Sequence, residues 1–159
     1  MWKDGDLDEY EKYGIHPDQE LIWKDELAKE LFSNLNVEHD STLTGLHIII
    51  NYFGDYCILR KLVEYLSQNY READSFLKIR YAEDLWDIIQ KCENFNVHCP
   101  EDLMAHTMKL AMEILENMLN HEIEINAESE IILDFNNDLS NDEYLINRGK
   151  SLYEAFLDI

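Results

Sequence analysis

The chain has 159 residues, and its 34 Asp and Glu against 13 Lys and Arg give a formal net charge of −21 at pH 7. A field of this sign repels phosphate backbones and attracts basic surfaces, so we expect no direct binding to nucleic acid and a basic protein as partner. Hydrophobic residues make up 46% of the chain, which is enough for the core of one domain and separates it from disordered acidic tails.

Residues 1–15 are expected to form an acidic, aromatic arm that packs loosely or becomes ordered on binding, because they show no regular hydrophobic period. Trp2, Tyr10 and Tyr13 lie among carboxylates there, a composition typical of protein interfaces. Ordinary packing of the arm onto the helices explains these rings equally well. Residues 16–159 are expected to form a single helical domain.

Two helices are expected at the start of this domain. Pro17 suits the first turn of a helix that ends near Asn34 to Asn36, since a missing N–H has no consequence in the first turn. Its predicted buried stripe is apolar except at one lysine: Leu21, Lys24, Leu27, Ala28, Leu31 and Phe32. A second helix is expected over residues 40–53, with a buried strand as the alternative because of its consecutive isoleucines.

Three further helices have clearer patterns. Gly54 separates the second helix from a third, which Asp55 caps and which continues to about Asn69. The buried stripe predicted for this third helix is Ile58, Leu59, Leu62, Val63 and Leu66. A fourth helix is expected over residues 75–92, and a fifth begins at Pro100. The fifth carries the most regular stripe in the chain: Leu103, Thr107, Leu110, Ala111, Ile114 and Met118. Its acidic side chains lie on the opposite face.

Apolar residues alternate between residues 122 and 135, which is typical of strands and leaves a small β-hairpin open there. Ser140 followed by Glu143 is a capping box, and a closing helix with a period of three to four residues continues to Phe156. The predicted fold is therefore mainly α: a compact bundle of five or six helices, with a β-hairpin near residues 122–135 as a possible addition.

An uninterrupted acidic run occupies residues 110–147, which contain ten carboxylates and no Lys or Arg. Like charges gathered in one region repel each other in the folded state, so the run favours a function that uses its field. A role in solubility alone is the alternative. We predict that the partner-binding residues are the ten carboxylates of the run: Glu113, Glu116, Glu122, Glu124, Glu128, Glu130, Asp134, Asp138, Asp142 and Glu143.

Candidate metal and phosphate sites are weak. Cys92, His98 and Cys99 are close in the sequence, but they lack the second pair of ligands that a zinc site usually shows. The five glycines are isolated and form no phosphate-binding loop. We therefore expect neither a metal nor a cofactor.

Candidate catalytic pairs are equally weak. Asp102 and His106 lie four residues apart on a predicted helix, where a stabilising surface contact explains them better than a catalytic dyad. Cys57 could meet His47 only through tertiary contacts, and no third group to orient them is evident. We therefore expect that the protein is not an enzyme.

The opening residues are acidic and lack the basic start and apolar stretch of a signal peptide, and the longest apolar patch, residues 48–50, is much shorter than a membrane span. The three cysteines are odd in number and scattered, which is typical of a reducing compartment. We expect a cytoplasmic protein that does not contact a membrane.

The acidic run and the acidic, aromatic arm, together with the size and helical character of the chain, resemble the cytoplasmic immunity proteins that bacteria pair with polymorphic or contact-dependent growth-inhibition toxins. The resemblance implies that the protein neutralises a cognate toxin, which in these systems is often an RNase or a DNase. It implies no individual binding residue.

Two other functions remain open. An inhibitor of a restriction or CRISPR effector that mimics nucleic acid would have carboxylates spaced like phosphates along an elongated surface. An enzyme with an unrecognised site would have Asp102, His106 or Cys57 in a pocket with perturbed acidity.

Overall fold

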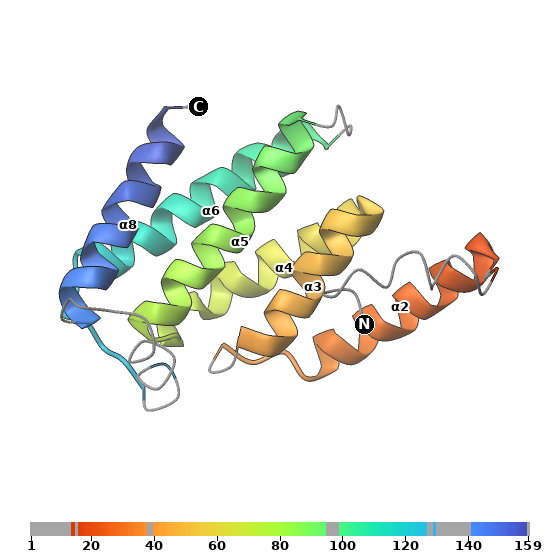
Figure 1. Ribbon diagram of the computed structural model, residues 1–159, viewed down its shortest axis with the longest axis horizontal. Coiled ribbons are helices and arrows are strands. Elements are labelled where there is room, and N and C mark those ends of the chain that lie inside the picture. Colours follow the sequence, from red (N-terminus) through yellow and green to blue (C-terminus); the bar gives the residue numbers. More distant parts are fainter. Residues whose placement is uncertain are drawn as a thin grey trace.

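The computed structural model describes residues 14, 16–37, 40–94, 99–126, 129 and 141–158 (Figure 1). These residues contain six helices with defined bounds and no β-strand: α2 (Pro17–Ser33), α3 (Asp40–Phe53), α4 (Tyr56–Asn69), α5 (Ser75–Asn94), α6 (Glu101–Leu119) and α8 (Asn141–Leu157). A short 3₁₀ helix, η1 (Tyr70–Glu72), connects α4 to α5. The predicted bundle of five or six helices is confirmed. Apart from Gly14, the predicted arm lies outside the described residues.

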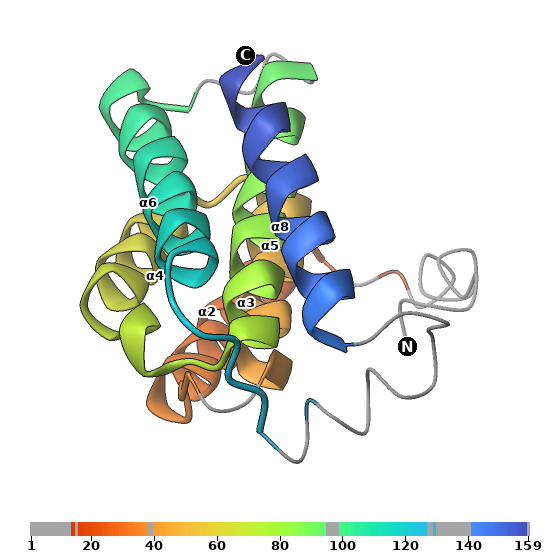
Figure 2. The same ribbon diagram turned by 90° about the vertical axis from the view of Figure 1, so that its left-hand side faces the viewer.

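Helix α5 occupies the middle of the bundle and packs against α3, α6 and α8. Helix α4 packs against α3 and α6, whereas α2 lies at the outer edge and packs mainly against α3. Figure 1 shows α2 and α3 on one side of α5 and α8 on the other, and Figure 2 shows α8 running beside α5. Within the described ranges, none of the helices has both the length and the apolar character that crossing a bilayer requires.

Local sequence signals set the ends of several helices. Pro17 is the first residue of α2, and Gly54, with a φ of +62°, separates α3 from α4. Asp55 caps α4 by accepting hydrogen bonds from the backbone N–H groups of Cys57 and Ile58, at 3.0 and 3.2 Å. Pro100 immediately precedes the first residue of α6. The prediction that it is the first helical residue is therefore wrong by one position.

The predicted stripes of α4 and α6 are completely buried and form much of the core, together with the apolar face of α5. The strand alternative for residues 40–53 is wrong, because Leu43, Leu46, Ile49 and Ile50 are buried at helical spacing and pack into this core. Gly149 lies where α8 approaches α6, and a Cβ at this position would require the terminal methyl of Met118 to shift.

The stripe predicted for α2 is only partly correct. Ala28 is buried, but Leu21 and Leu27 are each 48% exposed. Lys24, the polar exception in the stripe, has only 10% of its side chain exposed and is bonded to Asp55 at the start of α4. Because α2 has few neighbours apart from α3, only one narrow side of it is covered, and apolar residues beside that line remain in contact with solvent.

Candidate partner-binding surface

Six of the ten predicted partner-binding carboxylates belong to the described residues, and all six are exposed. Glu113 and Glu116 lie in the second half of α6, Glu122 and Glu124 lie in the segment that follows it, and Asp142 and Glu143 lie in the first turn of α8. The other four, Glu128, Glu130, Asp134 and Asp138, lie outside the described residues.

These positions surround one end of the bundle. Figures 1 and 2 both show the end of α6, the following segment and the start of α8 at the same end of the molecule, close to the start of α5. We call the six described carboxylates at these positions the acidic end. The structure therefore brings together residues that are up to 30 positions apart in the run, which no local pattern in the sequence predicts.

Residues 122–126 do not form a strand, so the prediction of a β-hairpin is wrong for these residues. Residues 127–128 and 130–135 of the predicted hairpin lie outside the described residues. The backbone groups of this segment bond to the start of α5 instead. Ser75 donates its N–H to the Glu124 carbonyl at 2.8 Å, and its hydroxyl accepts the Glu124 N–H at 3.1 Å. Ile123 and Ile125 pack against the core, which accounts for their alternation.

Asp74 is the second anchor of this segment, and its sequence context gave no sign of this role. One carboxylate oxygen accepts the Leu77 N–H at 2.8 Å and so caps α5, while the other accepts the Asn126 N–H at 3.1 Å. We expect the change Asp74→Ala to lower the free energy of unfolding by about 1 kcal/mol through the lost cap. Hydrogen exchange should become faster at the amides of Leu77 and Asn126, and unchanged exchange at Asn126 would contradict this anchoring role.

Three cations on the elements around the acidic end are engaged within the chain or buried. Arg148, the first base after the acidic run, donates to both carboxylate oxygens of Glu83 on α5, with its Nε 2.5 Å from Oε1. Lys109 lies 3.3 Å from Glu113, and both side chains are substantially exposed. Lys78 is buried, and this burial lowers its pKa even though Glu124 and Asp74 favour its charged form.

A second polar cluster joins α3 to α5. The Nδ1 of His47 lies 3.2 Å from the Oδ1 of Asp84, and its Nε2 lies 2.8 Å from the Oδ2 of Asp87. Partial burial acts to raise the pKa of Asp87, but hydrogen bonds from Lys91 and His47 lower it overall. A histidine that acts as a general base must present one ring nitrogen to a substrate, whereas both nitrogens of His47 contact carboxylates. The arrangement therefore suits a structural contact between two helices.

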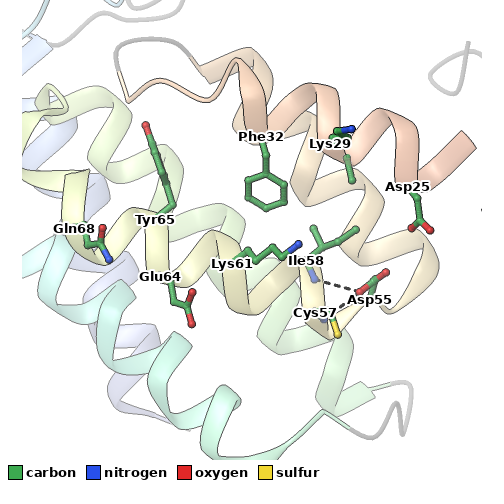
Figure 3. A pocket seen from close by; sticks show the side chains of 11 residues that line it. Asp25, Lys29, Phe32, Asp55, Cys57, Ile58, Lys61, Glu64, Tyr65 and Gln68 are labelled. Atoms are coloured by element: carbon green, nitrogen blue, oxygen red, sulfur yellow. Dashed lines mark hydrogen bonds between the residues drawn. The ribbon is translucent and has the colours of Figure 1, made fainter.

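The pairing of Cys57 with His47 is not formed, because the His47 ring contacts α5. Cys57 instead lies in an open groove of about 650 Å³ between α2 and α4 (Figure 3). Phe32 and Tyr65 line this groove, and the Lys61 ammonium lies 6.0 Å from the centre of the Phe32 ring. The described residues that line it include no histidine that could activate the Cys57 thiol.

The remaining chemical candidates are also dispersed. Asp102 contacts Arg60 of α4 at 3.4 Å in an exposed pair, and His106 is exposed on α6. Cys92 and Cys99 are partly buried, and burial raises the pKa of Cys99 to about 12 with a further contribution from Cys92. Since the thiolate is the reactive and metal-binding form, this environment disfavours both roles for Cys99. Among the described residues, no three potential ligands lie close enough to hold a metal ion, and His98 lies outside them.

The cluster that joins α3 to α5 was missed by sequence reasoning. His47 and Asn51 lie four residues apart on α3, and Asp84 and Asp87 lie three apart on α5, so each pair shares a helix face. Only the packing of α3 against α5 brings the two pairs together. The chain matches no protein-family model, no curated protein and no solved structure.

Proposed function

We propose that this protein binds a basic protein partner and neutralises it, in the manner of an immunity protein that inhibits a nuclease toxin in the cytoplasm. The observation that carries the proposal is the acidic end, where six exposed carboxylates from three parts of the chain surround one end of the bundle. Arg148 and Lys109, on the helices that carry it, contact carboxylates of the same chain, and Lys78 is buried, so these three cations reduce its field only locally.

The positions of these carboxylates are not explained by helix stability alone. Asp142 and Glu143 in the first turn of α8 interact favourably with the helix dipole, but Glu116 lies in the last turn of α6, which has no basic residue. A carboxylate at a helix C-terminus is unfavourable by about 0.3–1 kcal/mol. Glu116 accepts a hydrogen bond of 2.6 Å from the Tyr153 hydroxyl, which fixes its position without neutralising its charge.

A nuclease is the partner class that this chemistry favours. Its cleft is built to attract phosphates, so carboxylates that enter the cleft compete for the same positive potential. Attraction between opposite charges can raise association rates toward about 10⁸–10⁹ M⁻¹s⁻¹ at low salt, and rapid capture is useful against a toxin. The segments that carry these carboxylates meet at one end of the bundle instead of extending along its length (Figure 1), which favours a protein partner over mimicry of a nucleic acid.

The test reverses charge at the acidic end. In a double variant, Glu122→Lys with Glu124→Lys, we expect association with the partner captured from the source organism to slow about tenfold at low salt, with a much smaller change in dissociation. The matched control is Glu26→Lys with Glu30→Lys, which makes the same change in net charge at two exposed positions on α2.

Both association rates are measured by stopped-flow fluorescence over a range of salt concentrations. The difference between the two double variants should disappear at high salt, where charges are screened. Equal association rates for the two double variants at low salt would mean that the acidic end has no special role, and the proposal would then fail.

A further inference from the structure

Exposed apolar side chains are concentrated at the edge of the bundle that lies away from the acidic end. Of the seven large apolar side chains that the described residues expose most, six lie on α2 and α3, and each is 45–52% exposed: Leu21, Ile22, Trp23, Leu27, Ile48 and Tyr52. Single exposed apolar residues are common on protein surfaces, but a contiguous group of this kind is typical of an interaction site.

Four of these side chains line one groove of about 620 Å³, in which Trp23 and Leu27 come from α2, and Ile48 and Tyr52 come from α3. Phe53 completes the lining, and its ring packs edge to face against Tyr52 with 4.8 Å between the ring centres. We call this the α2–α3 groove. Leu21 and Ile22 do not line this groove, because the helical spacing places them on other sides of α2. Aromatic and aliphatic side chains in such a groove are the composition of a binding hot spot.

The packing of α2 explains why the α2–α3 groove is open. The side of α2 that faces α3 presents Ala28 and Leu31, and Leu31 lies directly against Gly45 of α3. Trp23 and Leu27 lie beside this contact, and no other described helix packs substantially against α2. A partner that covers several of these half-exposed side chains would remove their remaining apolar area from water, which favours binding.

The charged residues that line the α2–α3 groove indicate whether its occupant is positively or negatively charged. The lysines that line it are already held by carboxylates of this chain, since Lys24 contacts Asp25 and Asp55, and Lys91 lies 3.0 Å from Asp87. Glu20 also lines the groove and forms no ion pair with another described residue. Charge that is not neutralised at the groove is therefore negative, as is the net charge of −21.

This charge disfavours two occupants from the chain itself. A second copy would bring another −21, and residues 1–15 carry more acidic than basic side chains. We infer that the α2–α3 groove is a docking site for a cationic amphipathic helix of a partner protein. The apolar face of that helix packs between α2 and α3, and its Lys or Arg residues lie near Glu20. This site goes beyond the proposed function, because it lies at the opposite edge from the acidic end (Figure 1) and has its own chemistry.

The test uses a synthetic helical peptide of about 18 residues, long enough to span several turns, with Leu and Trp on one face and Lys on the other. Binding is measured by fluorescence anisotropy of the labelled peptide at 0.5 M salt, where the screening length falls to roughly 4–5 Å and general attraction to an acidic protein is weak. Ile48→Glu is compared with Leu157→Glu, since both replace an exposed apolar residue, 47% and 62% exposed respectively, by a carboxylate.

We expect Ile48→Glu to weaken binding at least tenfold and Leu157→Glu to change it less than twofold. Both variants gain the same negative charge, so electrostatic attraction alone would make them equal, and only Ile48 lines the groove. Thermal unfolding of both variants should remain close to that of the wild type, which confirms that the exposed substitutions leave the fold intact. Charge reversal at Glu122 and Glu124 should not alter the affinity of the peptide at 0.5 M salt. The docking site at the α2–α3 groove and the partner-binding role of the acidic end are therefore tested independently of each other.

Several results would overturn the inference. Equal affinities of the two variants, or equal binding of a scrambled peptide without an apolar face, would show that the groove does not anchor the helix. Equal binding of a peptide with Glu in place of Lys would contradict the preference for a cation. A wild-type dimer that Ile48→Glu dissociates would assign the groove to a second copy. Cross-links from Lys3 or Lys12 to Lys24 or Lys91 within the free monomer would assign it to the chain's own arm.

Discussion

The change Leu85→Ala is expected to lower the free energy of unfolding by about 2–5 kcal/mol, because it removes a large side chain from the centre of the core and leaves a cavity. Leu85 is 0% exposed and lies on α5, the helix that packs against α3, α6 and α8. In a close-packed core, the neighbouring side chains cannot relax into the space without losing their own contacts. Urea unfolding followed by circular dichroism measures the effect.

Leu157→Ala is the matched control for this change. The same chemical truncation is made at the end of α8, where the leucine is 62% exposed, so the expected change lies within about 0.5 kcal/mol. A loss below 1 kcal/mol for Leu85→Ala would mean that the centre of the bundle repacks readily, contrary to the tightly enclosed core described above. Similar losses in both variants would contradict the assignment of Leu85 to the core.

The second large effect is expected at Asp55, whose carboxylate has two structural roles. It caps α4 through the N–H groups of Cys57 and Ile58, and it bonds to Lys24, which ties the peripheral helix α2 to the start of α4. Asp55→Ala removes the cap, with an effect of about 1 kcal/mol, and leaves the partly buried Lys24 without one of its two carboxylates, with a similar effect. We expect a total loss of about 2 kcal/mol in the free energy of unfolding.

Asp55→Asn separates the two roles, because asparagine is as good an N-cap as aspartate but carries no charge. Its loss should be about half that of Asp55→Ala. If the two variants lose equal stability, the cap contributes little and the bond to Lys24 accounts for the whole effect; if Asp55→Asn loses nothing, the charge of Asp55 has no role.

The contribution of the Asp55 charge should depend on pH. Partial burial acts to raise the pKa of Asp55, but the hydrogen bonds from Lys24 and the Ile58 amide lower it overall below the ordinary value of 3.8. A lowered pKa in the folded state means that the charged form stabilises the fold at any pH above 3.8 and that this stabilisation is lost as the pH falls below it. The stability difference between wild type and Asp55→Asn should therefore be constant near neutral pH and shrink in acid. A difference that grows in acid would contradict this sign.

Helix positions were predictable because their signals are local. The capping aspartate before α4, the proline at the start of α2 and the apolar stripes of α4 and α6 all lie within a few turns of the residues that they organise. The error at residues 122–126 has a tertiary cause. Alternating apolar residues are shared by strands and by extended segments whose backbone groups bond elsewhere, and here the partners, Asp74 and Ser75, lie about 50 residues earlier.

The exposed residues of α2 are a second case in which tertiary packing could not be predicted from the sequence. The period of residues 17–33 predicts one buried stripe, and an isolated helix gives no information about how much of that stripe a neighbour will cover. Leu21 and Leu27 stay half exposed because α2 lies at the edge of the bundle, where its main contact is α3. Two of the six exposed apolar residues on α2 and α3, Leu21 and Leu27, were therefore predicted as core.

The sequence by itself determined the negative charge, the helical fold and the exposed acidic face of α6, since these follow from composition and from spacing within single helices. Only the tertiary structure decided which carboxylates lie together at the acidic end and which cations are neutralised before a partner can meet them. Arg148 and Glu83 are 65 residues apart, and His47 and Asp87 are 40 apart, so their pairing depends on how α3, α5 and α8 pack. Contacts over such separations depend on the geometry of the whole bundle, which no local pattern encodes.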